Sequence, residues 1–261
     1  MIDLHSHILP GLDDGAQDPD QSLEMARLAA EDGISGIVCT PHSPPVFPAN
    51  RRATILAAVE ELRTRLRKAQ IRLELYPGSE LSIQSKLPEK IESGELLSIN
   101  DNRKIALIEM PIDLIPPNLD RFFRMIRLQG IDTVLAHPER NYCLMKNPSA
   151  LFEWVQAGVM VQITAASLRG HYGQAIRGFS LELLRHRMVH FVSTDSHSPE
   201  RRAPVLSEAR AITESVTGAE DAHRIFFEYP VRIVRGEVPD LMPPISFEKK
   251  ASLIRRIFPF Q

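Results

Sequence analysis

Two closely spaced pairs of metal-binding residue types stand far apart in the sequence, His5 with His7 and Asp195 with His197. Because side chains at positions i and i+2 of a strand point to the same side, each pair can face a single ion. Further donors follow other short apolar runs, and the full set of candidate metal ligands is His5, His7, Asp14, His42, Glu80, Glu109, His137, Asp195 and His197. This set combines imidazole and carboxylate without a thiolate, a mixture that suits Mn, Fe, Zn or Co.

The number of donors predicts more than one ion. One ion takes about four to six ligands, so this set indicates two or three divalent ions with bridging carboxylates. A single carboxylate such as Glu80 or Glu109 near a strand end is more often solvated than bound to a metal. The agreement among six predicted strand ends favours the metal site. Paired ions are typical of enzymes that hydrolyse phosphate esters.

The elements that would position these donors are short strands that alternate with helices. Seven apolar runs predict strands at residues 2–5, 36–40, 73–77, 105–108, 133–136, 159–163 and 191–193. Helical crossovers indicate a parallel sheet of the α/β class, and the count favours a closed or nearly closed barrel. The carboxyl ends of its strands would open on one face, where an active site forms. The turn at residues 9–15 has no glycine-rich nucleotide-binding pattern, which disfavours a doubly wound sheet.

Helix signals lie between the strand runs. Asp18 is a typical N-cap, with Pro19 in the first turn and Gln21 completing a capping box. Apolar residues spaced by four and three predict a second helix over residues 55–69. Further helices are predicted at residues 118–129, 148–156, 174–187, 203–217 and 220–229.

Composition excludes several classes of protein. The 261 residues are 43% hydrophobic and 25% charged, which excludes a disordered chain and a coiled coil. The net charge of -2 argues against a nucleic-acid binder. No apolar run is long enough for a membrane span and no secretory signal is recognisable, so we expect no stable membrane insertion. The two cysteines, Cys39 and Cys143, read as free thiols in a reducing cytoplasm. The oligomeric state is left open.

Three stretches carry a family pattern: residues 1–11 with His5-Ser6-His7, residues 136–141 with His137-Pro138-Glu139-Arg140, and residues 193–197 with Asp195-Ser196-His197. With Asp13-Asp14-Gly15, they resemble the polymerase-and-histidinol-phosphatase (PHP) superfamily. More narrowly, the chain is similar to the bacterial manganese-dependent protein tyrosine phosphatases of the CpsB/CapC type. The resemblance spans roughly residues 1–235 and implies a distorted seven-stranded barrel with a trinuclear site. We therefore expect one PHP-type domain over residues 1–261, with 236–261 as a C-terminal extension.

The resemblance also implies a role for each candidate ligand. His5, His7 and Asp195 would hold one ion, and Glu80 would bridge it to a second. Glu109 and His137 would complete the second ion, while Asp14, His42 and His197 would contribute to the third. Asp3 and Asp13 would support the ligands rather than bind metal.

Two arginines match the family's phosphate-binding positions. Arg140 matches a catalytic arginine, and Arg202 matches a second one, with Arg201 as an alternative because the register is uncertain by one. The alternative to a phosphate-binding role is that Arg140 forms an ordinary surface ion pair with Glu139. A cysteine-based phosphatase would need an arginine six residues after its nucleophile. Neither Cys39 nor Cys143 has one.

The function implied by the resemblance is hydrolysis of phosphotyrosine on a membrane-associated tyrosine autokinase that controls capsule or exopolysaccharide synthesis. Mn²⁺ is the expected metal, and a metal-activated hydroxide would attack phosphorus. Another PHP phosphoesterase, such as histidinol-phosphate phosphatase, would have the same ion cluster. An amidohydrolase would typically add a bridging lysine, which no predicted strand end carries. A non-catalytic scaffold in polysaccharide assembly would not need the complete ligand set and Arg140.

The C-terminal residues combine basic and apolar types. Two readings are open: an amphipathic segment that touches a membrane or partner, and a tail packed on the barrel with its cations in water. The second is favoured because the segment is short. The residues concerned are Lys249, Lys250, Leu253, Ile254, Arg255, Arg256, Ile257, Phe258 and Phe260.

Overall fold

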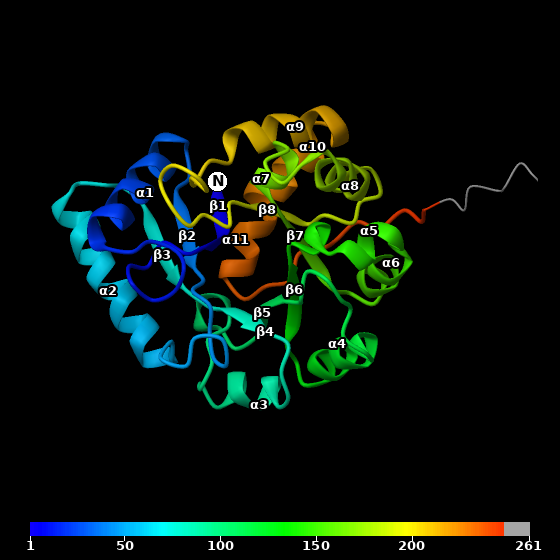
Figure 1. The fold of residues 1–261 in the computed structure, drawn as a ribbon, viewed down its shortest axis with the longest axis horizontal. Coiled ribbons are helices and arrows are strands. Elements are labelled where there is room, and N and C mark those ends of the chain that lie inside the picture. Colours follow the sequence, from blue (N-terminus) through cyan, green and yellow to red (C-terminus); the bar gives the residue numbers. More distant parts are fainter. Residues whose placement is uncertain (248–261) are drawn as a thin grey trace, which may run out of the picture.

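A computed structural model describes residues 1–247 of the chain. The basic and apolar tail from Lys249 to Phe260 lies outside the described residues. Two wholly parallel sheets form the centre, with strand orders β1-β2-β3 and β4-β5-β6-β7-β8 (Figure 1). Their strands are β1 (Ile2–Ser6), β2 (Gly36–Cys39), β3 (Glu74–Pro77), β4 (Glu80–Ser82), β5 (Ile105–Glu109), β6 (Asp132–Ala136), β7 (Met160–Thr164) and β8 (Phe191–Ser193). The predicted α/β class with parallel strands is confirmed.

A closed barrel of seven strands is not what residues 1–247 form. The structure has an eighth strand, β4, that the apolar pattern does not reveal, and the ladder is broken into two sheets. Pro41 lies just after β2, and Pro77 ends β3. Proline has no N–H with which to continue a ladder of backbone hydrogen bonds. The sheets still contact each other, near the ends of β1 and β8 and between β4 and the residues after β2. His7 N donates to Ser196 O at 2.9 Å, and Glu80 N donates to Pro41 O at 3.2 Å.

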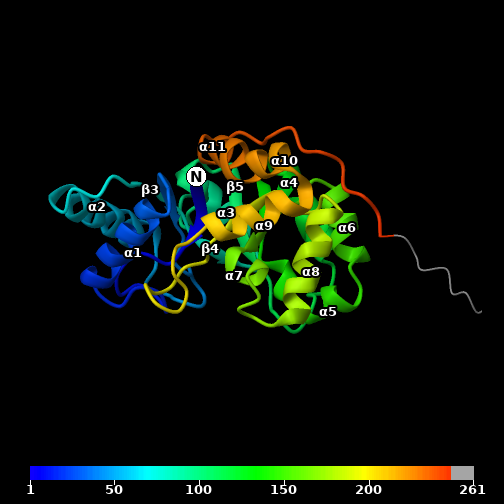
Figure 2. The same ribbon diagram turned by 90° about the horizontal axis from the view of Figure 1, so that it is seen from above.

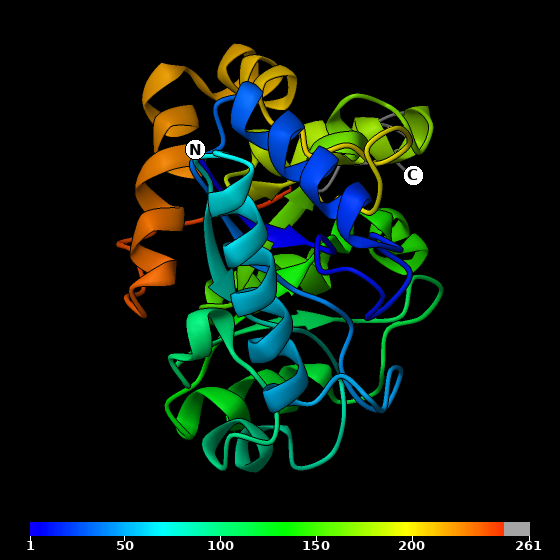
Figure 3. The ribbon, with the colours of Figure 1, turned by 90° about the vertical axis from the view of Figure 1, so that its left-hand side faces the viewer.

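Helices cover the outside of both sheets. They are α1 (Pro19–Glu31), α2 (Arg52–Lys68), α3 (Leu87–Glu92), α4 (Leu119–Leu128), α5 (Tyr142–Lys146), α6 (Ser149–Gln156), α7 (Ala165–Leu168), α8 (Gln174–Arg185), α9 (Ser207–Thr217), α10 (Ala219–His223) and α11 (Tyr229–Val234). Seen from the side, α1 and α2 lie next to each other over the first sheet (Figure 3). Within the described residues, no helix is both long and apolar enough to cross a membrane.

An inner core fills the space enclosed by the two sheets. Its buried side chains come from β1, β2 and β5 to β8, and α11 contributes Tyr229, Ile233 and Val234. Viewed from above, α10 and α11 lie together along one side of the molecule (Figure 2). The helix predicted over residues 220–229 is instead α10, a π-helical turn (Arg224–Glu228) and α11. Pro230 lies within the first turn of α11, where a missing N–H costs little.

The start of a helix depends on capping residues, and only some of these can be recognised in the sequence. Asp18 accepts from Asp20 N and Gln21 N, as its N-cap position predicts. The Gln21 side chain, however, accepts from Gln17 N rather than completing the box with Asp18. The helix predicted from residue 203 begins only at Ser207, because Asp32 accepts from the N–H groups that open α9.

Candidate metal centre

All nine candidate ligands converge at the carboxyl ends of the strands. His5 lies in β1, Glu109 ends β5, and His137 directly follows β6. Asp14, His42, Asp195 and His197 come from the loops after β1, β2 and β8. Glu80 comes soon after the end of β3 and also opens β4, and an isolated bridge pairs it with His42. The structure therefore brings together the complete predicted set.

The first group of donors is formed by His5, His7 and Glu80. The two imidazole Nε2 atoms lie 3.2 Å apart, and each is 3.4 Å from Glu80 Oε2. Asp195 Oδ1 lies 3.4 Å from His5 Nε2 and 3.5 Å from His7 Nε2. Four donors thus surround one point in a fully buried setting.

A second group is formed by His42, Glu80 and Glu109. His42 Nδ1 lies 3.1 Å from Glu80 Oε2 and 4.0 Å from Glu109 Oε2. His137 Nε2 lies 2.9 Å from Glu80 Oε1 and 3.6 Å from Glu109 Oε1. Glu80 therefore presents one oxygen to each of two histidines, as a bridging carboxylate must.

A third group joins His7, Asp14, His42 and His197. Asp14 Oδ1 lies 3.4 Å from His197 Nε2 and 3.7 Å from His42 Nε2. The Asp14 side chain is 60% exposed, so this group lies nearest to solvent. His7 and His42 each belong to two of these groups. The partition implied by the family resemblance assigns each of them to a single ion.

Buried polar neighbours orient the imidazoles. Asp13 Oδ2 lies 2.7 Å from His7 Nδ1 and also accepts from His42 N at 2.9 Å. Asp13 therefore lies behind two candidate ligands, in the supporting position expected for it. Gln162 Oε1 lies 3.0 Å from His5 Nδ1. Sequence reasoning missed Gln162, although β7 was the one strand without a donor at its end. Such partners fix which imidazole nitrogen faces a metal.

Local backbone distortion aims several of these side chains. The register of β1 against β2 shifts between Asp3 and Ser6, and a bulge of this kind re-aims neighbouring side chains. His137 and Asp195 have φ values of 34° and 50°, in the left-handed region that non-glycine residues rarely adopt. Such strain persists where the surroundings enforce it, and it concentrates at functional sites.

Gly15 is required beside the first ligands. A Cβ at this position would lie 2.1 Å from the backbone oxygen of His7. The close approach allows Ala16 N to donate to that same oxygen at 3.0 Å. The glycine of Asp13-Asp14-Gly15 therefore has a packing reason, because the loop must lie against the His7 backbone.

The electrostatics of the cluster favour the charged form of Glu80 and Asp195 but not of Glu109. Burial would raise the pKa of Glu80, but the neighbouring imidazoles, His5 foremost, hold it well below its usual range. The same balance of burial against His5 holds the pKa of Asp195 low. Burial and the charge of Glu80 raise the pKa of Glu109. Burial would lower the pKa of His7, but its carboxylate partners raise it well above normal. Charged carboxylates are the form that binds a cation.

Two arginines border the donors on one side. Arg140 Nη1 donates to Asp195 Oδ2 at 2.8 Å, and Arg202 Nη2 donates to the same oxygen. Arg201 is exposed, whereas Arg202 reaches Asp195, so Arg202 is the arginine that contacts the donor cluster directly. Glu139 is no surface partner of Arg140. It is fully buried, and its Oε1 accepts from groups of Thr164 and Ser167.

A tyrosine that sequence reasoning missed lies beside these arginines. The guanidinium carbon of Arg140 is 5.2 Å from the ring centroid of Tyr172, which is half-buried. Tyr172 follows α7 in a loop without donor clusters, so no spacing pattern could have revealed it. Its ring limits how far the Arg140 side chain can move.

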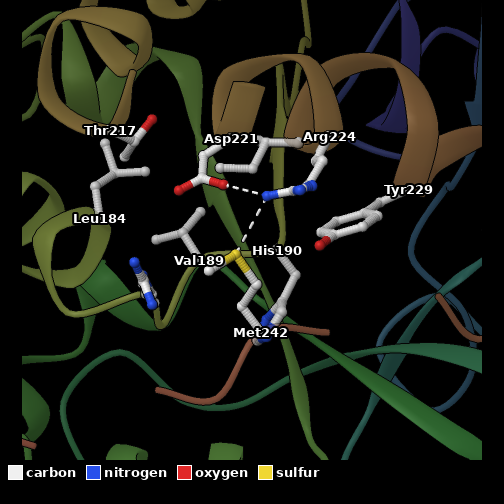
Figure 4. A pocket seen from close by; sticks show the side chains of 10 residues that line it. Leu184, Val189, His190, Thr217, Asp221, Arg224, Tyr229 and Met242 are labelled. Atoms are coloured by element: carbon white, nitrogen blue, oxygen red, sulfur yellow. Dashed lines mark hydrogen bonds and ion pairs between the residues drawn. The ribbon is translucent and has the colours of Figure 1, made fainter. Parts of the chain in front are cut away.

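A small cavity lies at the amino end of β8, away from the donor cluster, and its lining residues serve packing (Figure 4). Its volume of about 30 Å³ is room for one water molecule. Arg224 donates to Asp221 at 2.6 Å and to Met242 Sδ at 3.3 Å. His190 accepts from Val161 N at 2.9 Å, and burial lowers its pKa to about 4. Within residues 1–247, the donor groups exclude the remaining histidines, His171, His186, His190 and His223.

The fold and the cluster together define a class of protein, the metal-dependent hydrolases whose donors converge at the carboxyl ends of parallel strands. Its arginine pair suits an anionic phosphoryl group, since a planar guanidinium can bind two oxygens at once.

Within this class, the chain belongs to the CpsB/CapC family of capsular polysaccharide synthesis, whose family model matches residues 1–235. It is 40% identical over 220 residues to the tyrosine-protein phosphatase YwqE of Bacillus subtilis, across 84% of this chain and 86% of YwqE. It is 27% identical over 240 residues to the tyrosine-protein phosphatase CpsB of Streptococcus agalactiae serotype V, across 90% of this chain and 98% of that protein. The family predicted from the motifs is confirmed.

A solved structure gives the same result for the fold. One chain superposes with a TM-score of 0.91 at 37% identity, covering 95% of this chain and all of its own length. It comes from the crystal structures of YwqE from Bacillus subtilis and CpsB from Streptococcus pneumoniae, described as unique metal-dependent tyrosine phosphatases.

Proposed function

We propose that this protein is a metal-dependent protein tyrosine phosphatase that serves capsular or exopolysaccharide synthesis. The observation that carries the proposal is the convergence of nine nitrogen and oxygen donors beside Arg140 and Arg202. The family and the names of its relatives agree with the enzyme class predicted from the sequence.

The donor set fits divalent metal ions. Three groups of donors each lie within 4.8 Å of one another, and they combine imidazole and carboxylate without thiolate. We propose two or three ions held by the nine predicted ligands, with Mn²⁺ as the native metal and Fe, Zn or Co as other metals that suit the set. When bound, such ions supply a nucleophilic water of lowered pKa and offset charge on the phosphoryl oxygens.

The arginines bind and orient the phosphate. Asp195 holds both guanidinium groups with Oδ2, while its Oδ1 faces His5 and His7. A phosphoryl group on the donor cluster would therefore meet Arg140 and Arg202 at hydrogen-bonding range, where charge-assisted bonds are strongest. The leaving tyrosine phenolate has an ordinary pKa of about 10, so it departs more easily than an alkoxide.

A cysteine nucleophile does not fit the structure. Cys39 is fully buried in β2, and burial raises the pKa of its thiol to about 12. Cys143 lies in α5, and its Sγ donates to Asp113 O at 3.4 Å. A thiolate is the reactive form, and burial disfavours it at Cys39 more than the neighbouring Arg63 favours it.

The proposed substrate is phosphotyrosine on a membrane-associated tyrosine autokinase of the capsule pathway. The family's description and the tyrosine-phosphatase names of YwqE and CpsB support this choice. We place the enzyme in the cytoplasm, where the free thiols Cys39 and Cys143 remain reduced.

The test combines metal analysis with substrate comparison. The purified protein should contain divalent metal and release phosphate from a phosphotyrosyl peptide, should lose this activity on chelation, and should regain it with Mn²⁺. Histidinol phosphate and a peptide amide serve as comparison substrates. If histidinol phosphate were turned over faster than the phosphotyrosyl peptide, the protein would be a different phosphoesterase. Bound metal without hydrolysis of any substrate would indicate a scaffold.

A further inference from the structure

Exposed apolar side chains gather around the mouth of the metal centre. Half of the large hydrophobic residues exposed in the described chain follow β2, β5 or β6 at their carboxyl ends, on the face that holds the donors. They are Val46, Ile112, Leu114 and Tyr142, with exposed fractions of 55%, 39%, 46% and 54%. The donor cluster is polar and ionisable, yet these four side chains beside it are mainly apolar.

A cavity opens between the end of β4 and the loop after β5, directly against Glu109 of the donor cluster. Its volume is about 350 Å³. One wall is Glu109, the candidate ligand at the end of β5, and the only other polar side chain there is Ser82. The remaining lining is apolar, from Ile83, Met110, Pro111, Ile112 and Pro116.

The loop that forms this cavity is held to the segment carrying Arg140. Asn141 Nδ2 donates to Pro111 O at 2.7 Å and to Leu114 O at 3.0 Å. Tyr142 N donates to Ile112 O at 2.9 Å. Because Asn141 directly follows Arg140, the cavity wall and the phosphate-binding arginine are positioned together.

The opposite side of the mouth differs in chemistry. There a cleft of about 310 Å³ is lined by Asp14, His197, Arg201 and Arg202, with glycine, serine and glutamine between them. Two cations face this polar cleft, whereas Glu109 is the only ionisable residue that lines the apolar cavity. A peptide lying across the donors would therefore meet different surfaces on its two sides.

We propose that the apolar cavity is a subsite for an apolar side chain immediately next to the phosphotyrosine of the substrate. This inference rests on the proposed function and adds the substrate class to it. An acidic side chain there would leave water for a mainly apolar lining that has no arginine or lysine to pair with, while an apolar one would be removed from water against Ile112 and Met110. Neighbouring residues of an extended peptide are about 3.8 Å apart at Cα, which brings the adjacent side chain within reach of the cavity.

The first experiment compares phosphotyrosyl peptides on the metal-loaded enzyme. Two matched series carry Leu, Ser or Asp immediately before or immediately after the phosphotyrosine, in an otherwise fixed sequence. In one of the two series, we expect the peptide with Leu to have a kcat/KM about tenfold higher than that of the peptide with Asp. Equal kcat/KM for all peptides in both series would overturn the subsite while leaving the phosphatase intact. Failure to hydrolyse any peptide would instead refute the proposed function.

The second experiment removes the apolar wall. Ile112→Ser keeps the backbone oxygen that accepts from Tyr142 N, and we expect it to reduce the preference for Leu over Asp to within about twofold. Leu128→Ser on α4 is the matched control, since Leu128 is 81% exposed and lies outside the cavity. It should keep the parent's preference.

A binding measurement separates recognition from turnover. Non-hydrolysable phosphonate versions of the Leu and Asp peptides should show the same ratio in Kd on the parent, and a smaller ratio on Ile112→Ser. Unchanged preference in Ile112→Ser would overturn the assignment of the cavity. A change of oligomeric state in Ile112→Ser, without a change in preference, would identify this face as an interface between copies and would also overturn it.

Discussion

At the residue scale, Asp195 contacts both the donor cluster and the two arginines. Its Oδ1 faces His5 and His7, whereas its Oδ2 accepts from Arg140 and Arg202. The left-handed backbone of Asp195 and the hydrogen bond from its N to His5 O, at 2.8 Å, set this orientation. The two arginines thus share one carboxylate oxygen, which holds both guanidinium groups beside the donor cluster.

Replacing Arg140 separates phosphate binding from metal binding. Arg140→Ala should lower kcat/KM by about tenfold to a hundredfold, because a charge-assisted hydrogen bond contributes roughly 1.5–3 kcal/mol. Metal content and melting temperature should stay near the parent, since Arg202 still holds Asp195 Oδ2. Steady-state kinetics on a phosphotyrosyl peptide and elemental analysis measure both effects.

Arg140→Lys is the matched control for charge. It should recover only part of the loss, because an ammonium cannot make the two-point planar contact. A kcat/KM for Arg140→Ala within about threefold of the parent would contradict the phosphate-binding role. Loss of metal in the same variant would make the residue structural.

Tyr172 should act through Arg140 rather than on the substrate. A cation over an aromatic ring contributes about 0.5–2 kcal/mol, so Tyr172→Ala should raise the inhibition constant of inorganic phosphate by about twofold to thirtyfold. Tyr172→Phe keeps the ring and should stay near the parent value. If the Phe variant lost as much as the Ala variant, the hydroxyl rather than the ring would be the functional group.

At the element scale, buried polar groups fasten strands and helices from a distance. His190 sits at the amino end of β8 and accepts from Val161 N of β7. Asp32, which caps the end of α1, accepts from Leu206 N at 2.6 Å and Ser207 N at 2.9 Å at the start of α9. Each contact joins elements that are far apart in the sequence.

His190 should make the protein less stable in acid. Burial lowers its pKa from 6.5 to about 4, so between these values the unfolded chain binds a proton that the folded chain does not. The free energy of unfolding should therefore fall as the pH falls from about 6.5 to 4, by at most about 3 kcal/mol from this group. Denaturant unfolding at several pH values should show a smaller fall in His190→Gln. His223→Gln, at an exposed histidine, should keep the parent's slope, and equal slopes in all three proteins would refute the assignment.

Asp32 should stabilise α9 as an N-terminal cap. Asp32→Ala leaves the first N–H groups of α9 without this acceptor and should lower the free energy of unfolding by about 1–2 kcal/mol. Denaturant unfolding measures the loss, and Glu31→Ala at the neighbouring exposed position is the control. A loss in Asp32→Ala no larger than in Glu31→Ala would argue against the cap.

At the scale of the whole molecule, the metal centre joins the two sheets. Its donors come from β1 and β2 of the first sheet and from the strands or strand ends of β4, β5, β6 and β8 of the second. Ions bound there would cross-link both sheets where only a few backbone hydrogen bonds connect them.

Chelation should therefore lower stability as well as activity. A ligand that binds only the folded state stabilises it by about 2.7 kcal/mol at a hundredfold excess over Kd, so removing the ions should lower the melting temperature by several degrees. Mn²⁺ should restore both properties. His5→Ala and Asp195→Ala should each lose at least one ion and show a smaller response to Mn²⁺. Retained metal and activity in both variants would contradict the ligand assignment.

The local pattern of the sequence was enough to predict the seven apolar strands, most helices and the nine donors at strand ends. Hydrophobic period, capping residues and the His-x-His spacing are local properties, and parallel strands necessarily bring their carboxyl ends to one face. The break of the ladder into two sheets, the strand β4 and the support of His5 by Gln162 were decided by tertiary structure. So were the contact of Arg202 with Asp195 and the apolar cavity beside Glu109. These features depend on which distant side chains meet, and hydrophobic periodicity contains no information about such contacts.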